Sequence, residues 1–281
     1  MRDNVNLKYV SSRGEAFLFQ TKKVKTRSAN FMAYTWAPQV FEVKYGAKVK
    51  EINKEAVEYQ VELLLSGSSL KRRQFLEAFH FAADLDIAQG KAGRLYFGNM
   101  YIECFAITSS TDPEDNINET ANTVDFYCPY PSWIYSRTYA RPTRTVASVA
   151  ELMGVPEEEV VLSSGSYPVP FAALPSSFRL MFVGPIEDPY AKIVSSSETI
   201  ISGRNIGSGM NLIINSMTQK VTALGDYEDA YYYDYFDSTY NIFQKIEPFT
   251  TDDIEVLDAS RNPAANPILT VYYERSEPIW I

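Results

Sequence analysis

The sequence predicts a mainly β protein made of two β-rich units, with one helix in the first unit. Residues 39–49 and 55–65 each alternate between apolar and polar side chains, which indicates two half-buried strands. After residue 178, short strand patterns recur at ~8–12-residue spacing with turn residues between them, a spacing typical of an antiparallel sandwich. A chain of 281 residues can hold two cores, because single cores stop growing near ~250–300 residues.

The single helix is expected at about 69–83. The Ser-Gly-Ser-Ser run at 66–69 breaks the preceding strand and offers a helix N-cap. Phe75 and Phe79 lie on one apolar stripe of this helix. Three consecutive cations at 71–73 fall in its first turn, where the helix dipole disfavours positive charge. These cations therefore have partners elsewhere in the protein, or water solvates them.

The stretch 124–133, VDFYCPYPSW, predicts the junction between the two units. Phe126 lies on the apolar face of a strand that stops at Pro129 and Pro131. Each proline lacks an amide donor and pushes the residue before it toward extended backbone, so sheet pairing ends there. Trp133 follows as a large apolar anchor. We expect these four side chains to form the domain junction; an ordinary loop is the alternative.

The chain is expected to divide into a first unit at 1–136, a linker or insertion at 137–176 and a second unit at 177–281. Charge supports two units. Residues 1–136 carry 16 basic and 16 acidic side chains, whereas residues 137–281 carry 10 basic and 19 acidic side chains. The whole net charge of −9 therefore belongs to the second part of the chain. This acidity argues against nucleic acid as a partner of the second unit.

Other partner classes are also disfavoured. The one cationic cluster of note consists of Lys22, Lys23, Lys25 and Arg27. With no second cluster to support it, it indicates a solvated loop or a subunit contact rather than a nucleic-acid patch. No run of ~18 apolar residues is present, so no membrane span is expected. The N-terminal segment shows no apolar core of a secretory signal.

The residues needed for catalysis are scarce. His80 is the only histidine, and it lies between two phenylalanines of the expected helix, so a structural role is favoured. A Ser–His–Asp or Cys–His centre would have to be built around it. Residues 203–209 (GRNIGSG) indicate a turn, because they lack the serine position of a nucleophile elbow and the ending of a phosphate loop. Cys104 and Cys128 fit no zinc spacing and are expected as buried thiols. We expect no enzyme, no cofactor and no metal.

An acidic, tyrosine-rich stretch at 226–240 (DYEDAYYYDYFDSTY) is the candidate ligand or partner loop. Aromatic faces stack on sugars or anchor protein interfaces, and alternate aromatics also pack into a sandwich core. Calcium binding and acid–base glycoside chemistry are alternatives for its carboxylates, although a solvated acidic loop is commoner. The candidate residues are Tyr231, Tyr232, Tyr233, Asp234 and Tyr235.

Four features, in this order, resemble the distal tail proteins of siphophages, the baseplate-hub components of long non-contractile phage tails. The first is the alternating strand followed by a helix at 55–83, and the second is the strand end with its two prolines at 126–133, called the proline exit below. The third is the segment SFRLMFVGPIEDPYAKI at 177–193, and the fourth is the order of the last hundred residues. That last part runs from MNLIINSMTQKVTAL at 210–224 through an aromatic loop to a closing strand with Tyr272 and Tyr273. The loop at 226–240 and the segment 147–173 depart from the family pattern.

The resemblance implies an N-terminal β-sandwich-like domain that forms a homo-hexameric ring and a C-terminal galectin-like antiparallel β-sandwich. It implies a structural protein of the virion, made in the host cytoplasm, that joins the tail tube to the adhesion apparatus. The partners implied are further copies of the chain, the tail tube protein, the tail-tip hub and receptor-binding proteins. A carbohydrate-binding sandwich that uses the tyrosine-rich loop on a cell-surface glycan is the alternative function.

Overall fold

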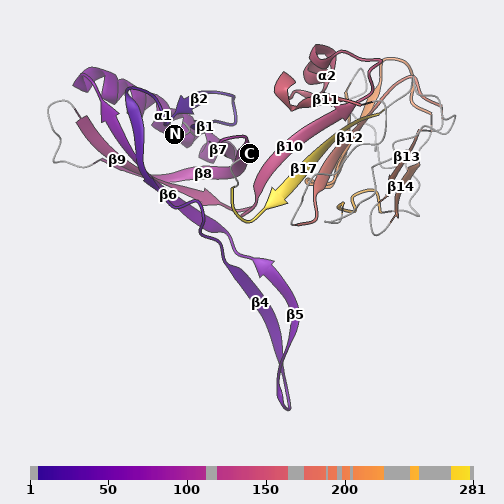
Figure 1. The fold of residues 1–281 in the computed structure, drawn as a ribbon, viewed down its shortest axis with the longest axis horizontal. Helices are drawn as coiled ribbons and strands as arrows, with labels where there is room; N and C mark the ends of the chain where they lie inside the picture. Colours follow the sequence, from indigo (N-terminus) through magenta and orange to yellow (C-terminus); the bar gives the residue numbers. More distant parts are fainter. Residues whose placement is uncertain are drawn as a thin grey trace. The chain divides into compact units, whose positions relative to one another are not determined.

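The computed structural model describes residues 6–111, 119–163, 174–187, 189–194, 198–202, 205–224, 241–246 and 267–278. Its contacts divide the chain into two units. Unit 1 comprises Met1–Ile134 with Ser276–Ile281, and unit 2 comprises Tyr135–Arg275 (Figure 1). Strands dominate both units, most neighbouring strands pair antiparallel, and β11 pairs with β10 in parallel. The mainly β fold class predicted from the sequence is confirmed.

Unit 1 is built around one long strand, β8, that takes part in two sheets. The first half of β8 pairs with β7, and its second half pairs with β9, which in turn pairs with β6. The strands of unit 1 are β1 (Leu7–Val10), β2 (Ala16–Leu18), β3 (Val24–Ala29), β4 (Trp36–Val43), β5 (Gly46–Lys54), β6 (Val57–Ser66), β7 (Gly93–Phe97), β8 (Met100–Thr111) and β9 (Glu119–Cys128). Strand β6 confirms the alternation predicted at 55–65, because Tyr59, Val61, Leu63 and Leu65 are all buried.

Residues 39–49 do not form the single half-buried strand predicted from their alternation. They belong to a hairpin of β4 and β5, joined at Lys44-Tyr45. Gly46 follows the turn with a φ of 119°, a left-handed conformation that glycine adopts without steric cost. The two-residue turn exchanges odd and even positions between the faces of the two arms, so Phe41 and Val49, which share one alternating set in the sequence, lie on opposite faces. The hairpin's large apolar side chains are also exposed rather than half-buried.

The helix α1 (Ser69–Gln89) extends beyond the predicted end at residue 83. It ends at Gly90, whose φ of 62° is left-handed; the Gly90 N–H donates to the Ile87 carbonyl, and the Lys91 N–H to that of Asp86. The extra turns hold a buried carboxylate, Asp86, near the helix C-terminus, where the dipole disfavours a negative charge. The Tyr9 hydroxyl (2.5 Å) and the Ser12 hydroxyl (2.6 Å) donate to it. Tertiary hydrogen bonds thus prolong the helix.

Aromatic rings join α1 to the sheets of unit 1. Phe79 of α1 contacts Tyr9 of β1 with ring centroids 5.6 Å apart and Phe17 of β2 at 5.4 Å. Phe126 of β9 lies 5.6 Å from Tyr9 and 6.3 Å from Phe19. These edge-on and tilted contacts bury large apolar rings from several elements in one core.

Unit 2 contains a sheet in the order β16-β15-β12-β17-β10, with β11 parallel to β10. The hairpin predicted near 210–224 is confirmed as β15 and β16. The elements are β10 (Trp133–Ala140), α2 (Val146–Met153), the 3-10 helix η1 (Glu157–Glu159), β11 (Val160–Leu162), β12 (Ser177–Val183), β13 (Tyr190–Val194), β14 (Glu198–Ser202), β15 (Asn211–Asn215), β16 (Lys220–Leu224) and β17 (Ile268–Arg275).

Much of the segment expected as a linker at 137–176 belongs to unit 2. Strand β10 pairs with β17, and buried Ala140, Val149 and Met153 pack with residues of β12, β15 and β17 in one apolar cluster. The Thr145 side chain caps α2 by accepting from the Ser148 N–H at 3.2 Å. The sequence predicts one or two short helical turns at 149–161, and the structure has α2 and η1 there with strands on either side.

Because their hydroxyls are buried, several tyrosines should make both units less stable at alkaline pH. Burial raises the pKa of Tyr59 to about 12, and it also raises the pKa values of Tyr139 and Tyr273, whose hydroxyls lie 2.9 Å apart. An unfolded tyrosine loses its proton near pH ~10, whereas the folded one keeps it to higher pH. The stabilisation is therefore complete below pH ~10 and is lost as pH rises toward the folded pKa.

We expect the free energy of unfolding to fall between pH ~10 and ~12 by up to about 1.4 kcal/mol per pH unit for each such tyrosine. Urea unfolding at pH values across this window measures it. Lysines titrate in the same range, so the matched comparison is Tyr59→Phe. This variant should show a shallower pH slope than the parent, and equal slopes in the two proteins would contradict the assignment.

Candidate assembly surface

The hairpin β4–β5 is an amphipathic element with an exposed apolar face. Residues paired across antiparallel strands share a face, and the register pairs Val40 with Val49 and Pro38 with Ile52. Val40 is 55% exposed, Val49 56% and Ile52 54%. Trp36, two positions before Pro38, lies on the same face and is also exposed. In Figure 1 the hairpin projects away from the rest of unit 1.

The opposite face of the hairpin mixes polar and apolar residues. The register pairs Gln39 with Glu51 and Phe41 with Lys48 there. A register shift between Gln39 and Val40 leaves one extra residue, Lys50, in β5. A hairpin of two strands is at best marginally stable alone in water. An apolar face on such an element gains most from burial against another surface.

The base of the hairpin is fixed by the proline exit that sequence analysis singled out. Lys54, the last residue of β5, donates from Nζ to the Pro131 carbonyl at 3.1 Å and to the Ser132 hydroxyl at 3.2 Å. The same ammonium lies 5.2 Å from the ring centre of Trp36, the first residue of β4. The Lys54 side chain therefore links the proline exit, the end of β5 and the start of β4.

Trp133 provides a second link to the start of the hairpin. Its indole Nε1–H donates to the Tyr59 hydroxyl at 3.3 Å, and that hydroxyl donates to the Ala33 carbonyl at 3.1 Å, three residues before β4. Both rings are fully buried, and Phe31 packs against them with centroids 5.5 Å from Trp133 and 5.8 Å from Tyr59. Buried polar groups that are satisfied in this way specify one arrangement of the chain.

The four predicted junction residues have different surroundings. Phe126 and Trp133 are fully buried in unit 1, Pro131 is buried, and Pro129 is exposed. The structure thus brings Pro131 and Trp133 to the base of the hairpin and leaves Phe126 in the core under α1. A role for these residues in setting the domain junction stays a prediction. The candidate loop residues Tyr231–Tyr235 lie outside the described residues.

Sequence analysis missed the hairpin as a surface element. The available signal was Gly46 inside an apolar–polar run, next to Lys44 and Tyr45, because glycine inside a strand pattern indicates a bulge or turn. Of the hairpin's side chains, Tyr45 at the turn is 87% exposed. That exposure would have been hard to foresee for a tyrosine in an alternating run.

His80 forms a contact that sequence reasoning did not foresee. Its Nε2 lies 2.8 Å from the Ser109 hydroxyl, which is also 3.1 Å from Nδ2 of Asn122. A catalytic dyad needs a group that orients the histidine, and none of the carboxylates in the described ranges is hydrogen-bonded to His80. The described residues contain no group of three or more His, Cys, Asp or Glu placed to hold a metal. Among them, no helix is long and apolar enough to cross a membrane.

No protein-family model and no curated protein matches the chain, but solved structures do. A chain of the phage P2 baseplate in its activated conformation with Ca superposes with a TM-score of 0.62 at 10% identity, over 98% of this chain and 99% of that one. A chain of the phage p2 baseplate with Sr gives 0.59 at 11% identity, over 98% and 99%.

The Dit protein of phage SPP1, described as a paradigm of the hub adsorption apparatus in phages that infect Gram-positive bacteria, is also similar. It gives a TM-score of 0.56 at 12% identity, over 96% of this chain and 99% of that one. At these identities the comparisons establish the fold. The chain therefore has the fold of phage baseplate hub proteins along nearly its whole length, as the sequence resemblance implied.

Replacing Trp133 tests the link between the exit and the core. Trp133→Ala should lower the free energy of unfolding of unit 1 by about 3–5 kcal/mol, because it removes a fully buried ring and a hydrogen bond. Trp133→Phe should cost less, since it keeps most of the ring contacts. Tyr45→Ala at the exposed turn is the matched control and should stay within about 0.5 kcal/mol. Equal urea midpoints for Trp133→Ala and Tyr45→Ala would contradict the link.

Proposed function

We propose that this protein is a structural component of a phage tail tip. Copies of the chain close into a hexameric ring that joins the tail tube to the adhesion apparatus. The observation that carries the proposal is the likeness in fold to baseplate and hub proteins over 96–98% of the chain. The scarcity of catalytic groups in the sequence agrees with a structural role. The protein would then be located in the virion, after synthesis in the host cytoplasm.

The hairpin β4–β5 supplies a specific contact for such a ring. Its apolar face, formed by Trp36, Pro38, Val40, Val49 and Ile52, would pack on the next copy of the chain. This contact is heterologous, since the hairpin of one copy meets a different surface of its neighbour, and it closes into a ring when the rotation between copies allows it. Packing would also cover the exposed strand edges of the hairpin, which otherwise risk aggregation.

The firm base of the hairpin favours this use. Lys54 and Tyr59 tie the hairpin ends to the proline exit and to the core of unit 1. A contact element that is held at its base loses less conformational freedom when it binds. The ring contact is therefore assigned to this hairpin and to the surface that it meets on the next copy.

Further partners follow from the same proposal. The tail tube protein, the tail-tip hub and receptor-binding proteins would bind the ring and unit 2. The alternative function, a sandwich that binds a cell-surface glycan through Tyr231–Tyr235, stays a hypothesis from sequence, because that loop lies outside the described residues. Glycan-array binding that is lost when these tyrosines are replaced by alanine would support it.

Light scattering over a concentration series tests ring formation. The parent protein should reach the mass of a hexamer, or approach it with rising concentration. Val40→Lys combined with Val49→Lys should keep the protein monomeric, because two ammonium groups on the apolar face would lose their hydration when that face packs on a neighbour. Loss of assembly should come without loss of unit 1 stability, as measured by urea unfolding.

The control changes the opposite, mixed face of the same hairpin. Gln39→Lys adds a lysine opposite Glu51, and it should leave the assembled mass unchanged. If the parent assembles and the double lysine variant assembles equally well, the hairpin face is not the ring contact. A parent protein that stays monomeric, both in solution and with purified tail tubes, would count against the ring itself.

A further inference from the structure

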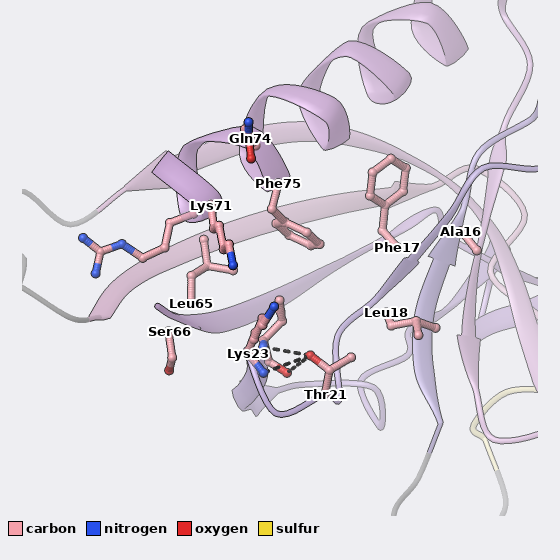
Figure 2. A pocket seen from close by; sticks show the side chains of 12 residues that line it. Ala16, Phe17, Leu18, Thr21, Lys23, Leu65, Ser66, Lys71, Gln74 and Phe75 are labelled. Carbon is pink, nitrogen blue, oxygen red and sulfur yellow. Dashed lines mark hydrogen bonds between the residues drawn. The ribbon is translucent and has the colours of Figure 1, made fainter. Parts of the chain in front are cut away.

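A groove of about 490 Å³ lies on unit 1, away from the hairpin. Strand β2, the turn before β3, the end of β6 and the first turns of α1 surround it (Figure 2). None of the hairpin residues lines it. The groove is therefore a second surface feature, independent of the proposed ring contact.

The floor of the groove is apolar and partly aromatic. Phe17 of β2 and Phe75 of α1 contact each other edge to face, with ring centroids 6.1 Å apart and planes at 82°. Val24 and Leu65 are buried beneath, and Leu18 stays 46% exposed at the side. In Figure 2, Phe17 and Phe75 approach each other from the strand and the helix. Such a floor suits an aromatic or branched apolar side chain.

The groove is lined by cations and by no acidic residue. Lys23, Lys71 and Arg72 are its charged side chains. Within the described part of the chain, neither Lys23 nor Lys71 forms an ion pair. The third cation of the first helical turn, Arg73, forms an ion pair, since its Nε lies 2.7 Å from Oε1 of Glu77. The positive charges that sequence analysis found misplaced at the helix start are thus divided between this groove and a local ion pair.

The start of α1 adds to the positive potential. The first turn contains no acidic residue, and the N-cap Ser68 makes no side-chain hydrogen bond to the helix. The N-terminal end of a helix carries a partial positive charge. A negatively charged group on an occupant of the groove would therefore be attracted by both the lysines and the helix end, above an apolar floor.

These charges decide between possible occupants. The exposed hairpin of a second copy is a poor fit, because it carries Lys44, Lys48, Lys50 and Lys54 against Glu42 and Glu51. An anionic membrane needs a broad basic surface, whereas residues 1–136 have equal numbers of basic and acidic side chains. We propose that the groove binds an acidic peptide segment of a partner protein, which packs an apolar side chain against Phe17 and Phe75 and sets carboxylates against Lys23 and Lys71.

Fluorescence anisotropy with the full-length protein tests this binding. The probe is a fluorescein-labelled peptide, Glu-Phe-Glu-Glu-Phe-Glu, and its comparison is the same peptide with glutamine in place of glutamate. We expect the glutamate peptide to bind more tightly and to weaken with added salt. The variant Lys23→Glu with Lys71→Glu should bind it at least about tenfold more weakly, because two attractive contacts become repulsive.

Matched controls separate the groove from general charge and general apolarity. Lys22→Glu with Lys25→Glu reverses two nearby lysines that do not line the groove, and it should leave binding within about threefold of the parent, since exposed charges without direct contact to the peptide are screened by water and salt. Leu18→Gln should weaken binding, whereas Leu70→Gln, at an exposed leucine of α1 outside the groove, should not. Thermal melts confirm that each variant is folded.

Three outcomes would overturn the proposal. The first is equal binding of the glutamate and glutamine peptides, or no binding of either. The second is equal weakening by the groove lysines and by the control lysines. The third is binding of phosphatidylglycerol vesicles, lost in the groove variant, without binding of the peptide, which would assign the groove to a membrane surface. The ring experiment is unaffected by any of these, because it depends on the hairpin alone.

Discussion

The buried contact between Trp133, Tyr59 and Ala33 is the constraint on which the projecting part of unit 1 depends. It joins the proline exit after β9 to the residues just before β4, and Lys54 joins the other end of the hairpin to the same exit. Both rings are fully buried. Without this fixed base, an amphipathic hairpin of two strands would be a flexible exposed segment. With it, the apolar face is presented from a defined position on unit 1.

Sequence patterns predicted the elements whose burial follows a simple period and missed those that depend on tertiary contacts. The alternation of β6 was recognised because its apolar residues all face one core. The last turns of α1 were missed because Tyr9 and Ser12 hold Asp86 there, and a buried acid at a helix end has no local signature. The hairpin β4–β5 was mistaken for one strand because apolar and polar residues keep alternating in the sequence across the turn, although the turn places Phe41 and Val49 on opposite faces.

The candidate site was predictable only in part for the same reason. Trp133 and Pro131 were singled out by local chemistry, but their function at the hairpin base depends on Lys54 and Tyr59, which are distant in sequence. The first-turn cations of α1 were noticed as misplaced, yet only the fold shows that Lys71 faces an apolar groove beside Lys23. Contacts between residues that are far apart in sequence cannot be read from the local patterns of a single sequence.

Unit 1 has two exposed apolar surfaces, the hairpin face and the groove, and the charges around them disfavour binding of one to the other. The hairpin as a whole and the groove both carry an excess of lysine, so the hairpin of one copy would be repelled from the groove of another. Specificity often rests on such a repulsive element as much as on attraction. An assembly that uses the hairpin between copies would therefore leave the groove open for an acidic partner. Ring closure and partner binding could then occur in either order, since the hairpin contact and the groove use separate surfaces of unit 1.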